Sequence, residues 1–248
     1  MGIGNVVERL YWRLESWIAP GVRFAQSDFE ECLSATIRPG DDWLDVGCGH
    51  NLLPEWRAAR EQELISATKT LVGLDPEFAA LRNHRSIRLL ICGDAGNLPF
   101  ATGSFDMVTA NMVVEHLPDP HRQFREIARV LKPGGRFVFH TPNSNGYPTL
   151  MARLVPDRVR ALAARTLERR PAEDRFPTFY RANTPAAIRS ACQEAGLVPD
   201  RIDLVRSTAM FWMITPIAIL ELFFLRMLGS PDMATLRPNL IAVLKKPD

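Results

Sequence analysis

The sequence has few cysteines and no closely spaced pair of them. Its four cysteines, Cys32, Cys48, Cys92 and Cys192, are scattered, and no C-x-x-C spacing occurs. A zinc cluster or a redox dithiol needs such spacing, so the pattern favours neither. Cys48 and Cys92 adjoin apolar strand patterns, where we expect them to be buried as small hydrophobic residues.

The sequence also lacks an excess of one charge sign. Thirty Lys and Arg nearly balance 28 Asp and Glu, which leaves a formal net charge of +2. A nucleic-acid-binding protein usually shows a basic excess or stripe, so we expect no nucleic-acid partner. The first residues show no basic-then-apolar leader pattern, and we predict a cytoplasmic protein. The 248 residues, 46% of them hydrophobic, suffice for one α/β domain.

Short apolar runs alternate with helical patterns along most of the chain. The expected strands are 43–46, 70–74, 87–92, 105–110, 137–140, 202–205 and 240–244. Continuous apolar strands separated by helices are typical of a parallel sheet covered by helices on both faces. We therefore predict an α/β fold with a doubly wound, Rossmann-like sheet.

We expect a single domain, 1–248, with four successive parts. These are N-terminal helices at 1–40, a core at 41–143, a lid at 147–182 and a C-terminal half at 184–248. The lid is helical and rich in arginine and proline, and an excursion after the carboxyl end of a strand is a natural cover for a site. In the C-terminal half, Thr184 and Pro185 begin a helix that Gly196 ends.

The most apolar stretch, 210–228, approaches the length of a membrane span. Pro216, Glu221 and Arg226 within it argue against a span, and the chain must return to a strand near 240. We predict an apolar helical hairpin that covers the site, a partner subunit or a membrane surface. This predicts peripheral membrane contact or a homodimer through 210–228, with an ordinary buried helix as the alternative.

The sharpest motif is a glycine turn, Asp45-Val46-Gly47-Cys48-Gly49-His50, between an apolar strand and a helix. Glycine lets a backbone turn tightly and approach a ligand closely. The third glycine of the dinucleotide pattern would be residue 52, which is Leu52, and this weakens a pyrophosphate-binding interpretation.

Two further carboxylates follow at strand ends. Asp75, which precedes Pro76, is placed to accept hydrogen bonds from ribose hydroxyls, with a helix cap as the alternative role. Asp94, next to Ala95, is placed to accept from an adenine amino group. Both spacings suit an adenosine ligand.

Two more motifs complete the order. The first runs from Ser104 to Val108 and leads to Asn111 and then Glu115-His116, and the second is Leu131-Lys132-Pro133-Gly134-Gly135-Arg136-Phe137. Together the five motifs resemble the class I S-adenosylmethionine-dependent methyltransferases, in particular the small-molecule group called type 11. The resemblance is dense between residues 43 and 143.

The resemblance implies a seven-stranded, mainly parallel sheet whose last strand is antiparallel, with S-adenosyl-L-methionine as cofactor. By this likeness Asp45, Gly47 and Gly49 would cradle the methionine part of the cofactor. Asp75 with Pro76 would hold the ribose and Asp94 with Ala95 the adenine. Asn111 would lie beside the sulfonium.

Some quinone-pathway relatives carry a Glu-x-x-Glu-His metal cluster after the fourth strand. Here Met112 replaces the first glutamate. Glu115 and His116 alone make a poor ligand set, so we expect no metal site.

A hydroxyl acceptor must lose its proton before or during methyl transfer. Candidate groups are His50, His116, His140 and Tyr180, of which His116 and His140 rank highest, although each histidine also fits a purely structural role. Tyr147, Tyr180 and Arg181 lie on the expected lid and are candidate substrate contacts; Arg181 would suit a phosphate or carboxylate.

The main interpretation is O-methylation of a small, glycan or lipid-linked metabolite. One rival is a nicotinamide-dependent oxidoreductase, and another is a non-catalytic interaction subunit with a methyltransferase-like fold. The retained Asp45, Gly47, Gly49, Asp75 and Asp94 argue against the second. A nucleic-acid methyltransferase is the third, but no Asn-Pro-Pro-Tyr-like motif follows the fourth strand.

Overall fold

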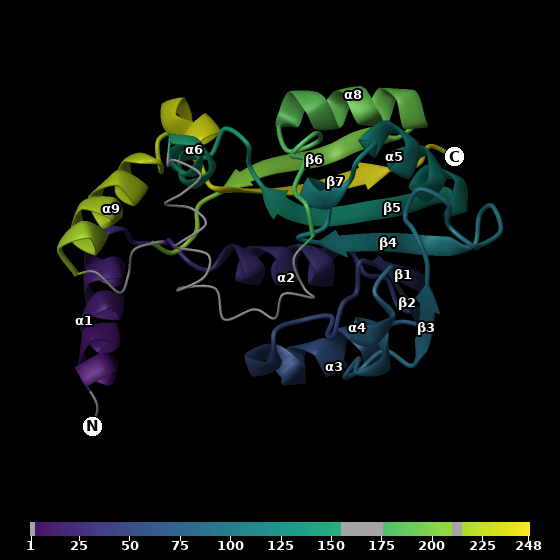
Figure 1. The fold of residues 1–248 in the computed structure, drawn as a ribbon, viewed down its shortest axis with the longest axis horizontal. Coiled ribbons are helices and arrows are strands. Elements are labelled where there is room, and N and C mark those ends of the chain that lie inside the picture. The colour runs from purple at the N-terminus through teal and green to yellow at the C-terminus, as the bar shows by residue number, and fades with distance from the viewer. Residues whose placement is uncertain (1–2, 155–175, 210–214) are drawn as a thin grey trace. The chain divides into compact units, whose positions relative to one another are not determined.

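The structure, a computed structural model, describes residues 3–154, 176–209 and 215–248. The chain forms two compact units. Unit 1 comprises 1–28, 142–176 and 204–240, and unit 2 comprises 29–141, 177–203 and 241–248. Each unit draws on three separated segments of the chain. Figure 1 shows the elements of both units.

Unit 2 is built on a seven-stranded sheet whose strands lie close to the predicted positions. They are β1 (Asp42–Val46), β2 (Thr70–Asp75), β3 (Leu89–Cys92), β4 (Phe105–Asn111), β5 (Leu131–Pro142), β6 (Val198–Val205) and β7 (Asn239–Lys245). The order is β3-β2-β1-β4-β5-β7-β6, parallel from β3 to β5 and antiparallel at the end. The predicted α/β fold is therefore confirmed.

Helices cover both faces of this sheet, as the continuous apolar strands require. They are α2 (Ala25–Thr36), the 3₁₀ turn η1 (Glu55–Arg57), α3 (Ala58–Ser66), α4 (Phe78–Arg82), the 3₁₀ turn η2 (Val114–His116), α5 (Pro120–Val130) and α8 (Pro185–Ala195). Helices α5 and α8 pack together on one side, and α2 lies on the other (Figure 1). Trp43, Met107 and Phe137 are fully buried between the layers.

The ends of α8 follow the predicted capping. Thr184 Oγ1 accepts from Ala187 N at 3.2 Å, and Gly196 ends the helix with φ 70°. Strand β5 instead begins earlier than expected, at Leu131, directly after α5. Gly134 N donates to Lys246 O and Lys246 N to Gly135 O, so pairing with the chain end extends β5 through the glycines.

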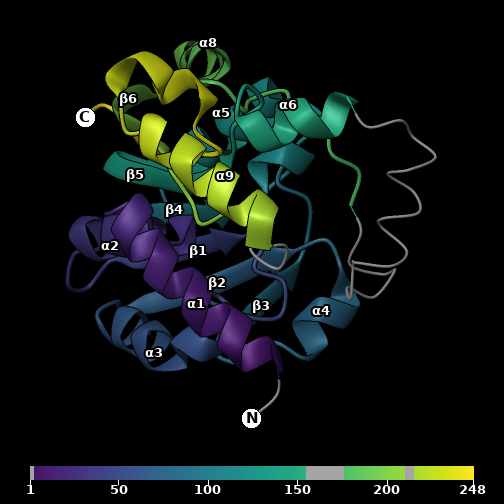
Figure 2. The same cartoon turned by 90° about the vertical axis from the view of Figure 1, so that its left-hand side faces the viewer.

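Unit 1 contains α1 (Ile3–Ile18), α6 (Tyr147–Leu154), α9 (Thr215–Met227) and the 3₁₀ turn η4 (Pro231–Leu236). Helices α1 and α9 pack side by side (Figure 2). Their shared core includes Ile18, Leu222 and Leu225. Where the sequence predicts an apolar hairpin at 210–228, the described part is one helix, α9. Residues 210–214 lie outside the described residues.

Candidate functional site

The glycine turn leaves β1 at Val46 and reverses through two left-handed residues. Gly47 has φ 69° and Gly49 has φ 54°. A Cβ on Gly47 would overlap the side chain of Val113, whereas a Cβ on Gly49 would meet nothing within 4 Å. Gly47 is thus required by packing, and open space lies over the backbone of Gly49, where a ligand can approach closely.

Asp75, at the end of β2, ties this turn to the neighbouring strand. Its Oδ2 accepts from Gly49 N at 2.9 Å and its Oδ1 accepts from Glu77 N at 2.8 Å. The side chain is buried. Each carboxylate oxygen has a second acceptor position, so Asp75 can hold the turn and still accept from a ligand hydroxyl.

Asp45 lies in a buried chain of hydrogen bonds between β1 and β4. Trp43 Nε1 donates to Thr109 Oγ1 at 2.7 Å, and that hydroxyl donates to Asp45 Oδ1 at 2.6 Å. Burial raises the pKa of Asp45 to about 7, and the nearby negative charges of Asp75 and Glu61 add to this, against the bond from Thr109. A cationic ligand group would favour the ionised carboxylate.

Asp94 follows β3 and shapes the next loop. Its Oδ1 accepts from Gly96 N at 2.8 Å, and the residue is exposed, while neighbouring Ala95 is buried. Arg122 Nε on α5 donates to Gly96 O at 2.8 Å and holds the loop. This arrangement presents a carboxylate beside an apolar wall. Pro76, after Asp75, is exposed.

Asn111 and His140 face each other at the carboxyl ends of β4 and β5. They are register partners, and His140 Nδ1 lies 3.0 Å from Asn111 Oδ1. His140 is buried, with the Phe29 ring of α2 at 5.7 Å between centroids. The next residue, Met112, has φ 58° and donates its N–H to His140 O at 2.8 Å. A non-glycine residue with this φ marks a constrained position.

His116 is placed differently. Its Nδ1 lies 3.0 Å from the carbonyl oxygen of Pro177, so this ring nitrogen is engaged with the segment that returns to unit 2. The other histidine candidate, His50, is exposed at the end of the glycine turn. His140 is therefore the histidine candidate that a strand-end side chain orients.

The segment 177–183 is bound to the loop after β4 by a network that sequence reasoning missed. Phe179 N and Tyr180 N both donate to Glu115 O, at 2.7 and 3.1 Å. Thr141 Oγ1 donates to Glu115 Oε2 at 2.8 Å and accepts from Asn183 Nδ2 at 2.6 Å. Glu115 thus connects the loop after β4 to residues 177–183. In the sequence, the metal-like motif Glu115-His116 is what draws attention to this residue.

The three predicted substrate contacts belong to different units. Tyr180, with φ 53°, and Arg181, which donates to Pro118 O at 2.5 Å, belong to unit 2. Tyr147 belongs to unit 1, where it is buried and donates to Glu221 Oε1 at 2.5 Å. Residues 155–175 of the predicted lid lie outside the described residues.

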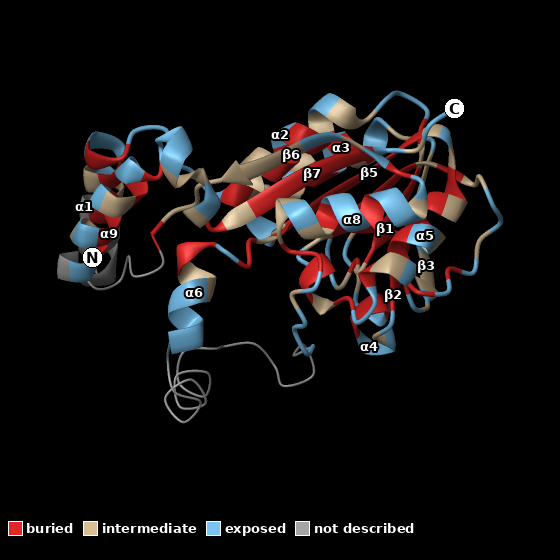
Figure 3. Ribbon diagram, turned by 90° about the horizontal axis from the view of Figure 1, so that it is seen from above, coloured by how far each residue is buried: buried red, intermediate tan, exposed pale blue. Residues whose placement is uncertain are grey.

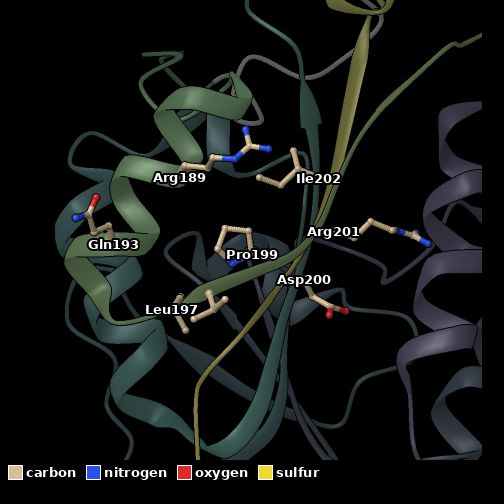
Figure 4. A pocket seen from close by; sticks show the side chains of 8 residues that line it. Arg189, Gln193, Leu197, Pro199, Asp200, Arg201 and Ile202 are labelled. Carbon is tan, nitrogen blue, oxygen red and sulfur yellow. The ribbon is translucent and has the colours of Figure 1, made fainter. Parts of the chain in front are cut away.

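Cys48 lies within the glycine turn and Cys92 at the end of β3, and the sequence predicts that both are buried. Cys48 is buried as expected, but Cys92 is exposed, because β3 is the edge strand of the sheet. A cavity of about 480 Å³ lies between α8 and β6, and Arg189 and Ile202 are among its lining residues (Figure 4). None of the predicted site residues lines it.

Among the described residues, no group of three or more His, Cys, Asp or Glu side chains is placed to hold a metal ion. Glu115 and His116, the remnant of the metal motif, already bind Thr141 and Pro177. The residues present do not fit a metal centre of that kind. The glycine turn, Asp75 and Asp94 do fit an adenosine-containing cofactor, because open backbone and acceptors meet at one sheet edge.

Residues 44–139 match the family model described as a methyltransferase domain. The chain is 36% identical over 119 residues to the demethylmenaquinone methyltransferase of Corynebacterium urealyticum, covering 46% of this chain and 48% of that protein. It is 37% identical over 122 residues to the ubiquinone biosynthesis O-methyltransferase of Escherichia fergusonii, with the same two coverages. The chain thus matches about half the length of these curated relatives.

Among solved structures, a Haloferax volcanii methyltransferase in complex with the Trm112 activator superposes with a TM-score of 0.56. It is 22% identical and covers 88% of each chain, a likeness that shows the fold. The strand order, the glycine turn with Asp45 and Asp75, and the family match over the first five strands agree with one another. On these grounds residues 44–139 resemble the class I S-adenosylmethionine-dependent methyltransferases, and the sheet has the fold of that class.

Proposed function

We propose that the protein transfers a methyl group from S-adenosylmethionine to an oxygen atom of a small, glycan or lipid-linked acceptor. The observation that carries this proposal is the open, carboxylate-lined turn at Gly49, with the Asn111–His140 pair on the next two strands, β4 and β5, at the same edge of the sheet. Carboxyl ends of parallel strands are where ligands bind in such folds.

The residues divide between holding the cofactor and handling the acceptor proton. Asp45, Gly47 and Gly49 would hold the amino-acid part, Asp75 with Pro76 the ribose, and Asp94 with Ala95 the adenine. Bound there, the cofactor supplies a methyl group already activated by a positively charged sulfur. Asn111 lies at the end of β4, where the acceptor would meet that methyl group.

We assign the acceptor proton to His140. When Nδ1–H donates to Asn111 Oδ1, the neutral ring carries its lone pair on Nε2, which would take the proton of the acceptor hydroxyl. Asn111 would thereby act as a positioning residue for the tautomer. His116 is the weaker candidate because its ring binds the Pro177 carbonyl.

For the acceptor, we favour an apolar, lipid-linked molecule of quinone type. Two relatives are named for menaquinone and ubiquinone biosynthesis, and α9 carries exposed apolar side chains. This acceptor class implies work near a membrane, by peripheral contact or through a subunit contact of the segment 210–228. Tyr180 and Arg181 remain candidates for contacting the acceptor.

Calorimetric titration of the full chain with S-adenosylmethionine, S-adenosylhomocysteine and NADH in parallel tests the proposal. Micromolar binding of the first two and none of NADH is expected. Heat with NADH alone would favour the nicotinamide-dependent oxidoreductase. No heat with any of the three ligands would favour the non-catalytic interaction subunit. Label transferred from S-adenosyl-[methyl-³H]methionine to short-chain demethylated quinols then tests the acceptor class.

A further inference from the structure

Helix α9 is apolar on two opposite faces. Ala218, Leu222, Leu225 and Leu228 follow helical spacing and are buried in the core of unit 1. Ile217, Leu220, Phe223 and Met227 also share one face, and their exposed fractions are 44, 71, 51 and 59%. We call these four residues the outer face. A surface helix normally presents polar residues outward, so this face is unlike a solvated one.

Two acidic residues in the described parts of these packed helices are buried. Glu221 on α9 is buried and accepts from Tyr147 Oη at 2.5 Å. Glu15 on α1 is buried and accepts from Tyr11 Oη, also at 2.5 Å, while Ala209 N donates to that same hydroxyl. Burial raises the pKa of Glu15, so this carboxyl group has a lower tendency to carry charge.

Within the described side chains of these two helices, the exposed charges are positive. Over residues 11–18 of α1 and 217–227 of α9, the exposed ionisable side chains are Arg13 and Arg226. Arg226 also donates to Ile18 O at 3.2 Å, which places its guanidinium where the two helices meet. An apolar helix face with exposed arginines nearby and buried acidic side chains is typical of a helix that lies on anionic lipid.

From this arrangement we infer that the outer face of α9 docks on the surface of an anionic lipid bilayer, with the helix axis parallel to the membrane plane. Thirteen residues give α9 a length of about 20 Å, short of the roughly 30 Å hydrocarbon core. No helix within the described residues is long and apolar enough to cross a membrane. The helix would therefore lie at the headgroup boundary rather than span it.

A second copy of the chain fits this face less well. In a two-fold dimer the same patch meets itself. Arg13 and Arg226 of each copy would then approach a surface whose two helices expose no acid among their described side chains. Anionic headgroups supply the missing negative charge. Trp17, 76% exposed on α1, adds an aromatic side chain of the kind enriched at membrane interfaces.

This inference deepens the proposed function, since it rests on a lipid-linked acceptor for its use, but its test needs no methyl transfer. The full chain is floated with vesicles of phosphatidylcholine alone, or with one quarter phosphatidylglycerol, at low and high salt. Binding to the anionic vesicles is expected, with a loss on raising the salt. The double variant Leu220→Ser, Phe223→Ser should reduce vesicle partitioning tenfold or more.

Two controls separate the outcomes. Trp56→Ser, Leu89→Ser removes equally exposed apolar side chains from unit 2 and should leave flotation unchanged. Arg13→Gln should weaken binding to anionic vesicles alone and serves if the double variant does not fold, as judged by its thermal unfolding. Equal flotation of wild type and a folded double variant would overturn the inference.

Failure of wild type to float would overturn it too, as would a gel-filtration dimer that the double variant dissociates. S-adenosylhomocysteine affinity, measured in parallel, keeps the two proposals distinguishable. Vesicle binding without cofactor binding would uphold the docking face and reject the methyltransferase. The reverse result would reject the docking face alone.

Discussion

Thr109 and Asp45 are register partners on adjacent strands, and the threonine hydroxyl donates to the buried carboxylate at 2.6 Å. Among the described ion pairs none includes Asp45, whereas Lys69 and Lys132 pair with Asp42 at the start of the same strand. The hydrogen bond from the Thr109 hydroxyl therefore stabilises the ionised carboxylate, whereas burial destabilises it. Ionisation of Asp45 should therefore affect how the free energy of unfolding depends on pH.

Stability of the ligand-free protein should fall as the pH rises toward 8. Asp45 has a folded pKa of about 7 against an ordinary 3.8, so its contribution is fully present below 3.8 and is lost as the pH rises through 7. Between pH 5.5 and 8 the loss is about 2 kcal/mol. Asp45→Asn should flatten this dependence in urea unfolding. An unchanged slope in the variant would contradict it.

Gly47→Ala should destabilise the protein more than Gly40→Ala does. Both glycines have a positive φ, so each substitution costs about 1 kcal/mol for the left-handed backbone. Only at Gly47 does the new Cβ also overlap Val113, and at Gly40 nothing lies within 4 Å. Urea unfolding should show an additional loss of about 1–3 kcal/mol. Equal losses would mean that Val113 moves aside freely.

Asp75→Ala should weaken S-adenosylmethionine binding by about 1.5–3 kcal/mol, the range for hydrogen bonds to a charged group. The variant loses the proposed ribose acceptor and also the acceptor of the hydrogen bond from Gly49 N. Glu77→Gln, at a neighbouring carboxylate that only caps α4, is the matched control and should bind normally. Calorimetry measures both. Normal affinity in Asp75→Ala would remove the residue from the proposed site.

His140→Gln should lower kcat by roughly 10²–10⁴ for a hydroxyl acceptor while leaving cofactor affinity close to normal. Asn111→Ala should act through the tautomer, with a smaller loss and an altered pH–rate profile. His116→Gln is the comparison, and we expect a weaker effect on kcat because its ring binds Pro177 O. A larger loss in His116→Gln would reverse the assignment.

Extensive chelation should leave methyl transfer unchanged. Glu115 and His116 bind Thr141 and Pro177, and Met112 occupies the third ligand position of the related metal motif. The measurement is the initial rate before and after dialysis against EDTA, with magnesium added back. Activity lost on chelation and restored by magnesium would show that a metal is required.

Most strands could be predicted because they contain short, largely apolar runs bounded by glycine, proline or aspartate. The glycine turn and the strand-end carboxylates follow directly, since parallel strands bring their ends to one edge. The early start of β5 could not be predicted, because Pro133 and Gly134 read locally as a helix stop. Pairing with Lys246, more than 100 residues away, extends that strand instead.

Hydrogen bonds between residues far apart in the sequence also could not be predicted. Nothing near Glu115 indicates that its carbonyl would accept from Phe179 and Tyr180, 64 and 65 residues later. The position of Tyr147 after β5 predicts a lid residue, but its hydroxyl donates a hydrogen bond to Glu221. The two-unit division was also hidden, because each unit joins three separated segments.

The position of β7 has a consequence for biosynthesis. This last strand lies between β5 and β6, so β6 has no neighbour in the sheet until residues 239–245 have left the ribosome. Until then β6 and the adjoining edge of β5 are unpaired in the nascent chain, and unpaired edges are sites for unwanted association. Truncations that remove β7 should therefore aggregate rather than yield a smaller folded core. Chaperone dependence should be strongest before residues 239–245 can join the sheet.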